Sequence, residues 1–294
     1  MNLVVGATGM VGTEVCRLLA STRKPVKAFV RVTSEPAKVQ KLEGLGATVV
    51  KGDLRDRASL KAACEGVDTV IATASSMPFA YRPDDNTPRS TDQDGALGLI
   101  AAAREAGVQR FVYTSFPAMA ASFPLQDAKR AVEERLRSSG LTYTILQPTY
   151  FTEIWLSPAV GFDPPNHKAV IYGTGDNRIS WISFLDVAQF AAASLDNPMA
   201  RNASIELGGP EGVSPSEVVK VFEKAGGQPF EVTHIPVEAL RAQLAAATDP
   251  MQKSFAGLML SYASATPIDM TATLKGFPLE LRTVAEHARS VMAP

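Results

Sequence analysis

The first half of the chain alternates short runs of β-branched residues with longer amphipathic runs. Strands are predicted at residues 2–5, 26–30, 47–51, 68–73, 110–115 and 142–148, and helices near 10–20, 35–44, 57–65, 92–106 and 126–139. Such alternation is typical of βαβ units, which build a parallel sheet with helices on both faces. The sequence therefore predicts an α/β fold around a doubly wound parallel sheet.

The rhythm changes after Pro148. Residues 157–179 are interrupted by prolines and glycines, so we expect only short strands there, and the Pro- and Asp-rich stretch 77–90 is expected to be a long loop. A helix at 183–196 and a strand at 203–209 are expected to return to the main sheet. Helices near 215–225, 237–247, 251–262 and 280–292 are expected to form a smaller, mostly helical cap. We predict a main domain of 1–155 with 181–210, and a cap of 156–180 with 211–294.

Charge and cysteine content narrow the possible partners and compartment. Lys and Arg number 29 and Asp and Glu 30 in the 294 residues, which argues against nucleic acid or an anionic membrane as a partner. Cys16 and Cys64 have no metal-ligand spacing, and the three histidines are scattered, so no metal site is expected. Neither a signal peptide nor a run of about 18 apolar residues is present, and we expect a cytoplasmic protein.

Three glycines, Gly6, Gly9 and Gly12, stand between the first predicted strand and the first predicted helix, in "VVGATGMVG". In this context backbone N–H groups and the positive end of the helix dipole point at a bound phosphate. For Gly12 the alternative role, close packing of the helix on the sheet, is expected in either case. For Gly6 and Gly9 we expect binding of a dinucleotide pyrophosphate.

The residue after the second strand selects between the two nicotinamide dinucleotides. An acid there would bind the adenosine ribose 2′-hydroxyl of NAD, but this chain has Arg31, which suits the 2′-phosphate of NADP. Asp53 and Leu54, after the third strand, are expected to flank the adenine. Whether Asp53 or Asp56 caps the following helix stays open at this point.

The segments "VVGATGMVG", "FVR", "GDLRD", "FVYTSF" and "AKRAVEERLRSSGLTYTILQPTYF" occur in an order and spacing that resemble the NmrA-like atypical short-chain dehydrogenases, relatives of isoflavone reductases. The resemblance covers about residues 1–210 and implies a Rossmann-type fold, bound NADP(H) and a substrate pocket beside the cap. The cofactor-binding residues expected from motif and resemblance together are Gly6, Thr8, Gly9, Met10, Val11, Arg31, Asp53, Leu54, Thr73, Ala74, Ser75, Thr114, Lys129, Pro148, Tyr150 and Phe151.

The resemblance also implies the catalytic residues, with one departure. Short-chain dehydrogenases use a Tyr-x-x-x-Lys pair, but Leu125 stands where the tyrosine would precede Lys129. Isoflavone-type reductases rely on the lysine, so Lys129 is the first candidate, and its alternative is a surface lysine paired with Glu133. Ser115 and Tyr150 are the other candidates; the alternatives are a strand-end cap for Ser115 and pocket lining for Tyr150.

Two functions remain open from the sequence. The first is an NADPH-dependent reductase of a small aromatic or conjugated carbonyl or alkene, acting as a monomer or homodimer. The second is a redox sensor or regulatory protein that binds NADP(H) without turnover. The missing tyrosine favours the sensor, and Lys129 favours the enzyme.

Overall fold

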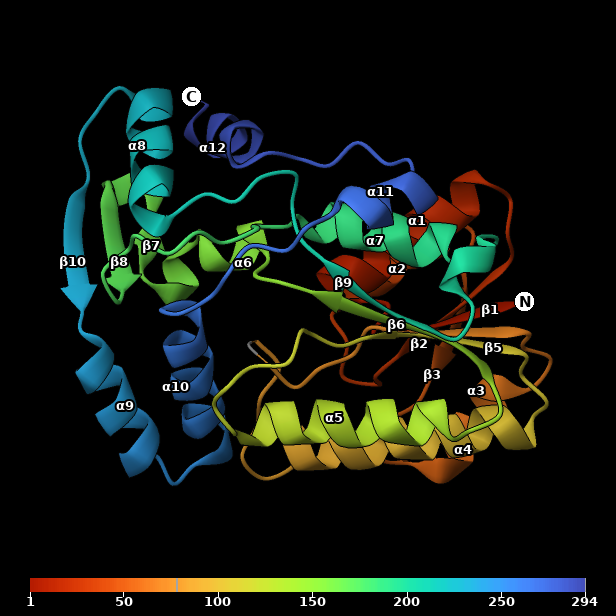
Figure 1. Ribbon diagram of the computed structural model, residues 1–294. Helices are drawn as coiled ribbons and strands as arrows, with labels where there is room; N and C mark the ends of the chain where they lie inside the picture. Colours follow the sequence, from red (N-terminus) through yellow and green to blue (C-terminus); the bar gives the residue numbers. More distant parts are fainter. Residues whose placement is uncertain (78, 294) are drawn as a thin grey trace. The chain divides into compact units, whose positions relative to one another are not determined.

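The computed structural model describes residues 1–77 and 79–293, and the chain divides into two compact units (Figure 1). Unit 1 comprises Met1–Phe116, Pro124–Gln147 and Val187–Ile205. Unit 2 comprises Pro117–Phe123, Pro148–Asp186 and Glu206–Pro294. These boundaries follow backbone packing, whereas the division into cofactor-binding and substrate-binding regions concerns ligands and stays a prediction.

A seven-stranded sheet in the order β3-β2-β1-β4-β5-β6-β9 forms the centre of unit 1, with the last two residues of β9 counted in unit 2. The first six strands pair in parallel, as predicted. The strands are β1 (Asn2–Val5), β2 (Val26–Val30), β3 (Thr48–Lys51), β4 (Thr69–Ala72), β5 (Arg110–Thr114), β6 (Thr142–Pro148) and β9 (Ala203–Leu207). The doubly wound Rossmann-type fold is thereby confirmed.

Helices cover both faces of this sheet. One face carries α3, α4 and α5 and the other carries α1, α2 and α7 (Figure 1). Their bounds are α1 (Met10–Ser21), α2 (Pro36–Gly44), α3 (Arg57–Cys64), α4 (Ala96–Glu105), α5 (Pro124–Arg137) and α7 (Phe184–Ala193), with the short helix η4 at Pro198–Ala200. Buried side chains such as Leu60, Leu99 and Val132 join α3, α4 and α5 to the sheet through one apolar core. Burial of this core supplies the main driving force for folding of unit 1.

One predicted boundary in unit 1 is wrong. The helix expected from residue 92 begins at Pro88, and its first part is a π-helix, η1 (Pro88–Gly95), which continues into α4. Thr87 and Ser90 form a reciprocal capping box at its start. The predicted loop 77–90, of which residue 78 lies outside the described residues, therefore ends three residues early, because Pro88 sits at a helix N-terminus, where proline is tolerated.

Unit 2 has its own core and a small sheet. Its sheet has the order β10-β8-β7, with strands β7 (Phe162–Asp163), β8 (Lys168–Tyr172) and β10 (Glu231–Ile235). The helices are α6 (Thr152–Trp155), η2 (Pro158–Val160), η3 (Pro164–Asn166), α8 (Pro215–Gly226), α9 (Val237–Ala246), α10 (Pro250–Tyr262), α11 (Thr271–Gly276) and α12 (Val284–Met292). The sequence did not predict β10 or α11. In the part of the chain that the structure describes, no helix combines the length and apolar character needed to cross a bilayer.

Candidate cofactor and active site

The strand order of unit 1 places most of the predicted residues at one edge of the sheet. The chain winds outward in opposite directions from β1 and β4, and the crevice beyond such a switch point is where ligands bind in doubly wound sheets. The glycine loop follows β1, and Thr73 to Ser75 follow β4, directly beside it. Arg31, Asp53 and Thr114 come at or after the carboxyl ends of β2, β3 and β5.

The three glycines of the loop have different reasons to be glycine. Gly6 has φ 84°, and an added Cβ would lie 2.7 Å from the Ala74 backbone nitrogen. A Cβ on Gly12 would lie 2.2 Å from Gly6 O, which confirms the packing role expected there. By contrast, a Cβ on Gly9 would meet only Gly6 O, at 3.2 Å, and its backbone is extended. The fold alone therefore does not require a glycine at position 9.

The start of α1 fits the pyrophosphate of a dinucleotide. Gly9 is the N-cap, it is exposed, no side chain caps the helix, and the first turn carries no acidic residue. The orphan N–H groups and the helix dipole thus remain available to an anion. Thr8 is half-buried and Met10 exposed beside this turn, whereas Val11 is buried. An unhindered Gly9 and an uncapped helix are the features that a bound pyrophosphate would use.

The residues after β4 are held tightly against β1. Thr73 donates both its backbone N–H and its hydroxyl to Val5 O, at 2.9 and 3.1 Å. Ser75 Oγ accepts the backbone N–H of Met77 at 3.2 Å. Both hydroxyls are therefore engaged within the protein, and Ala74 contributes backbone close to Gly6.

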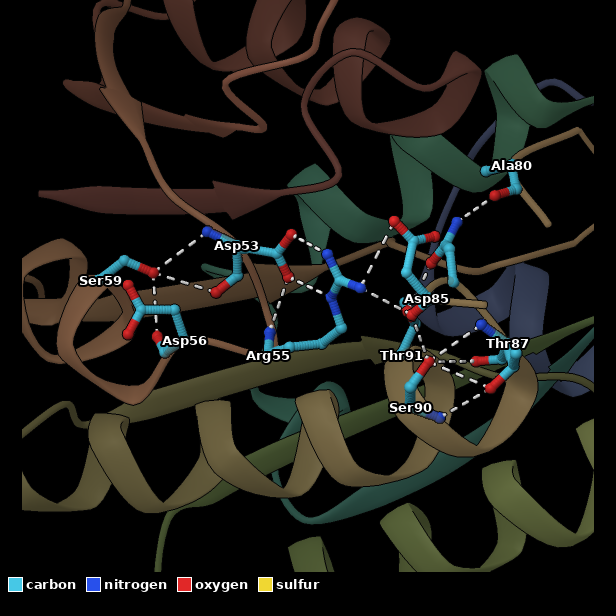
Figure 2. Close-up of polar contacts among 10 residues, drawn as sticks. Asp53, Arg55, Asp56, Ser59, Ala80, Asp85, Thr87, Ser90 and Thr91 are labelled. Atoms are coloured by element: carbon cyan, nitrogen blue, oxygen red, sulfur yellow. Dashed lines mark hydrogen bonds and ion pairs between the residues drawn. The ribbon is translucent and has the colours of Figure 1, made fainter. Parts of the chain in front are cut away.

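The corner formed by β2 and β3 carries both signs of charge. Arg31 is exposed, and none of residues 1–77 and 79–293 forms an ion pair with it. Asp53 binds Arg55, with Arg55 NH2 2.7 Å from Asp53 Oδ2 (Figure 2). Asp56 caps α3, because its Oδ1 accepts the Ala58 N–H at 2.9 Å, and this settles the choice that the sequence left open. Leu54, which directly follows Asp53 in the chain, is half-buried and packs against the core of unit 1.

Lys129 is buried on α5, and the alternative of a surface lysine paired with Glu133 is wrong. Its Nζ lies 3.3 Å from Asp92 Oδ1 and donates to Thr114 O at 3.3 Å. It also lies over the Tyr113 ring, 5.1 Å from the centre. Glu133 instead binds Arg130 and Arg137, each at 3.1 Å. Lys129 therefore lies beside the carboxyl end of β5, on the face of the sheet that α5 covers.

The charged form of Lys129 is favoured. Burial acts to lower the pKa of Lys129, but Tyr113 and the Asp92 carboxylate act against it, and the pKa is raised. Because Tyr113 is protonated at neutral pH, the charge that opposes the effect of burial there is that of Asp92. Burial raises the pKa of Tyr113 to about 12, against the opposing effect of Lys129. Asp92 is itself fixed by Ser76, whose N–H and hydroxyl donate to Asp92 Oδ2 at 3.0 and 2.6 Å. At neutral pH this arrangement holds an ammonium group beside β5.

Ser115 and Thr114 differ in what their hydroxyls bind. Ser115 is buried, and its Oγ accepts Arg130 NH2 at 3.1 Å. Thr114 Oγ1 is buried without a hydrogen-bond partner among the described residues, as is the Tyr113 hydroxyl. Buried hydroxyls without a partner are uncommon in proteins. Thr114 is half-buried at the carboxyl end of β5, where its hydroxyl could bind a ligand, whereas Tyr113 is buried within the core of unit 1.

Pro148, Tyr150 and Phe151 belong to unit 2. Pro148 is buried at the end of β6, and Phe151 is the half-buried N-cap of α6. Tyr150 is buried, with its ring centre 4.8 Å from that of Trp155 and 5.6 Å from that of Tyr262. Burial raises the pKa of Tyr150, so its hydroxyl stays protonated at neutral pH.

These rings are part of an aromatic cluster, defined as Tyr150, Trp155, Tyr172, Trp181 and Tyr262. Trp155 and Tyr262 are stacked, with an interplanar angle of 12°. A cavity of about 10 Å³, room for one water molecule, lies beside Trp155, Tyr172 and Tyr262. Tyr150 is packed within the core of unit 2 and does not line this cavity, so both of its expected roles, proton donor and pocket lining, stay predictions.

Sequence reasoning missed three residues of this site: Asp92, Tyr113 and Arg55. An acid near a helix start is an ordinary capping signal, and a tyrosine in a strand is ordinary core, so neither stood out. The one signal present was "GDLRD", where a basic residue lies between two acids. Over residues 1–77 and 79–293, no group of three His, Cys, Asp or Glu side chains could hold a metal ion.

The sequence pattern of the NmrA-like family matches residues 2–288. The chain belongs to this family. It is 33% identical over 301 residues to the NAD(P)H azoreductase of Xenophilus azovorans, covering 99% of this chain and 97% of that one. It is 32% identical over 271 residues to an isoflavone reductase homolog of Zea mays, covering 85% of this chain and 82% of that one. Among solved structures, the NADPH-dependent quinone oxidoreductase of Escherichia coli in complex with NADPH has the same fold, with a TM-score of 0.77, 24% identity and 99% coverage of both chains.

Proposed function

We propose that the protein is an NADPH-dependent reductase of a small aromatic or conjugated carbonyl or alkene compound. The observation that carries the proposal is the presence in unit 1 of both a glycine loop that leads into the uncapped helix α1 and a buried Lys129 on α5, whose Nζ binds Thr114 O at the end of β5. The first feature suits a dinucleotide, and the second provides a positioned proton or hydrogen-bond donor. Membership of the NmrA-like family supports the same reading.

The proposed roles follow from these positions. NADPH, when bound, supplies a hydride. The N–H groups at the start of α1 bind the pyrophosphate, and Arg31 binds the 2′-phosphate, with Thr33 and Ser34 as further donors. Lys129 holds the nicotinamide ribose or gives a proton to the reduced substrate. Because Asp92 keeps the lysine charged, Lys129 holds that proton at neutral pH.

The proposed class of substrate rests on the compounds that relatives are named for reducing. Relatives are named for the reduction of azo, isoflavone and quinone compounds, all of which are conjugated and aromatic or nearly so. The test is spectrophotometric NADPH oxidation against a panel of quinones, enones, aldehydes and azo dyes. We expect turnover with at least one compound, and none with any of them would contradict the proposal.

A second function, an NADP(H) sensor without turnover, is favoured by two observations. Leu125 is buried where the family's tyrosine would stand, and the phenol of Tyr150 has a raised pKa. The same panel separates the two functions, because a sensor would bind NADPH tightly but oxidise none. We further propose a small-molecule substrate as the partner, a cytoplasmic location, and a monomer or homodimer, which light scattering during gel filtration would measure.

A further inference from the structure

The ends of β2 and β3 bring a cation and a carboxylate to one corner of the sheet. The two strands are neighbours, with Val30 paired to Lys51, and Gly52 N–H donates to Val30 O at 2.9 Å. Arg31 directly follows Val30, and Asp53 directly follows Gly52. A phosphate bound by Arg31 would therefore lie close to the Asp53 carboxylate. An unbalanced negative charge there would oppose the binding of a phosphate.

One arginine neutralises that carboxylate (Figure 2). Arg55 donates three hydrogen bonds to Asp53, from its backbone N at 2.9 Å, from Nε at 2.8 Å and from NH2 at 2.7 Å. The side-chain pair is the bidentate geometry in which guanidinium and carboxylate bind most strongly. Accordingly, the Arg55 guanidinium holds the pKa of Asp53 below its usual range, and Arg31 contributes to the same lowering.

The guanidinium of Arg55 is also fixed on its other side. Arg55 NH1 donates to Asp85 O at 2.8 Å and lies 3.6 Å from Asp85 Oδ2, in the segment that leads to η1 (Figure 2). The backbone of Asp53 is held by Ser59, whose Oγ accepts Asp53 N–H at 3.1 Å and donates to Asp53 O at 3.0 Å. Arg55 is thus oriented toward Asp53 by two anchors.

We propose that Arg55 is a second determinant of the preference for NADPH, which acts by cancelling the negative charge of Asp53 beside the 2′-phosphate position at Arg31. The inference rests on the proposed function, because it requires NADPH to bind at this corner. Arg55 is a positioning residue here, since it acts through Asp53. NADH lacks the 2′-phosphate, so the charge on Asp53 affects its affinity less than that of NADPH.

The experiment measures the Kd of NADPH and of NADH by calorimetry for the full chain and for Arg55→Met, Asp53→Asn and the double variant. The readout is the ratio of the two Kd values, because any loss of adenine contacts affects both dinucleotides equally. In Arg55→Met we expect the preference for NADPH to fall on the order of tenfold at low salt, and less at high salt, where charges are screened. In the double variant we expect the preference to return to within about threefold of the parent, because the charge of Asp53, which directly follows the strand paired with that of Arg31, is gone.

Arg57→Met is the matched control, because Arg57 is in the same segment, its side chain is 83% exposed and it lies 4.0 Å from its partner Glu105. Its preference should equal that of the parent. Arg55→Lys keeps the positive charge and should retain most of the preference, and circular dichroism checks the fold of each variant. An unchanged ratio in a folded Arg55→Met would overturn the inference. So would a ratio that stays low in the double variant, since Arg55 would then contact the phosphate itself. If the parent protein binds no NADPH, the proposed function is wrong. The Kd of the parent protein alone tests this, whereas the variants test only the role of Arg55.

Discussion

At the scale of single residues, the buried pair of Lys129 and Asp92 links stability to the site. Their side chains are 6% and 0% exposed, so removing one partner leaves a buried charge without compensation. We expect Asp92→Asn to lower the free energy of unfolding by about 3 kcal/mol, measured by urea denaturation. The pKa of Lys129 is raised in the folded state. With respect to Lys129, the ion pair therefore contributes its full stabilisation of the fold below the unfolded-state pKa of about 10.4, and this contribution is lost only as the pH rises through the folded-state pKa.

The cost of Asp92→Asn should therefore be constant from about pH 6 to pH 9. Asp94→Asn is the matched control, because Asp94 lies in the same helix and its side chain is 51% exposed. A stability equal to that of the parent in Asp92→Asn would contradict the importance of the pair. Sequence alone could suggest Lys129 through its family position, but not Asp92, because the two residues lie on different helices and are 37 positions apart in the chain.

At the scale of elements, the turn from β1 to α1 contains Gly12, which close packing requires, and Gly9, which we expect to bind the cofactor. A Cβ at Gly9 would meet only Gly6 O, at 3.2 Å, so Gly9→Val should remain folded, with a modest loss of stability at the helix N-cap, and should lose NADPH binding by about 100-fold or more. A side chain at Gly12 would lie 2.2 Å from Gly6 O, so Gly12→Ala should be destabilised by about 1–3 kcal/mol. Thermal melts and NADPH fluorescence titrations measure both. Parent-like NADPH binding by Gly9→Val would make the loop a turn only.

Most elements of unit 1 could be predicted because their signals are local. Short β-branched runs mark β1 to β6, and the bounds of α1, α2 and α3 differ from prediction by one residue or so. The π-helix η1 was missed because its wide turn depends on packing against α5 and on the Thr87–Ser90 capping box, which local periodicity does not encode. Strand β10 was missed for a similar reason: it is an edge strand, mostly exposed, and is defined by its pairing with β8.

At the scale of the whole molecule, each unit has its own core, and the family match extends over residues of both. In unit 2, buried Asp186 accepts the backbone N–H of Arg282 at 2.8 Å and pairs with its guanidinium, which fixes the segment that leads into α12. Sequence predicted most of the cap helices but none of these long-range contacts. The aromatic cluster likewise joins positions from 150 to 262, which no window of sequence brings together.

The most direct test of the central claim, a reductase that relies on Lys129, is the steady-state kcat of Lys129→Met with the best compound of the panel, alongside its Kd for NADPH. We predict a loss of kcat by a factor on the order of 10² to 10⁴, the usual contribution of a general acid or base, with only a modest loss of NADPH affinity. Lys61→Met, at an exposed lysine of α3, should behave as the parent. An unchanged kcat in a folded Lys129→Met would contradict the account and remove Lys129 from the mechanism.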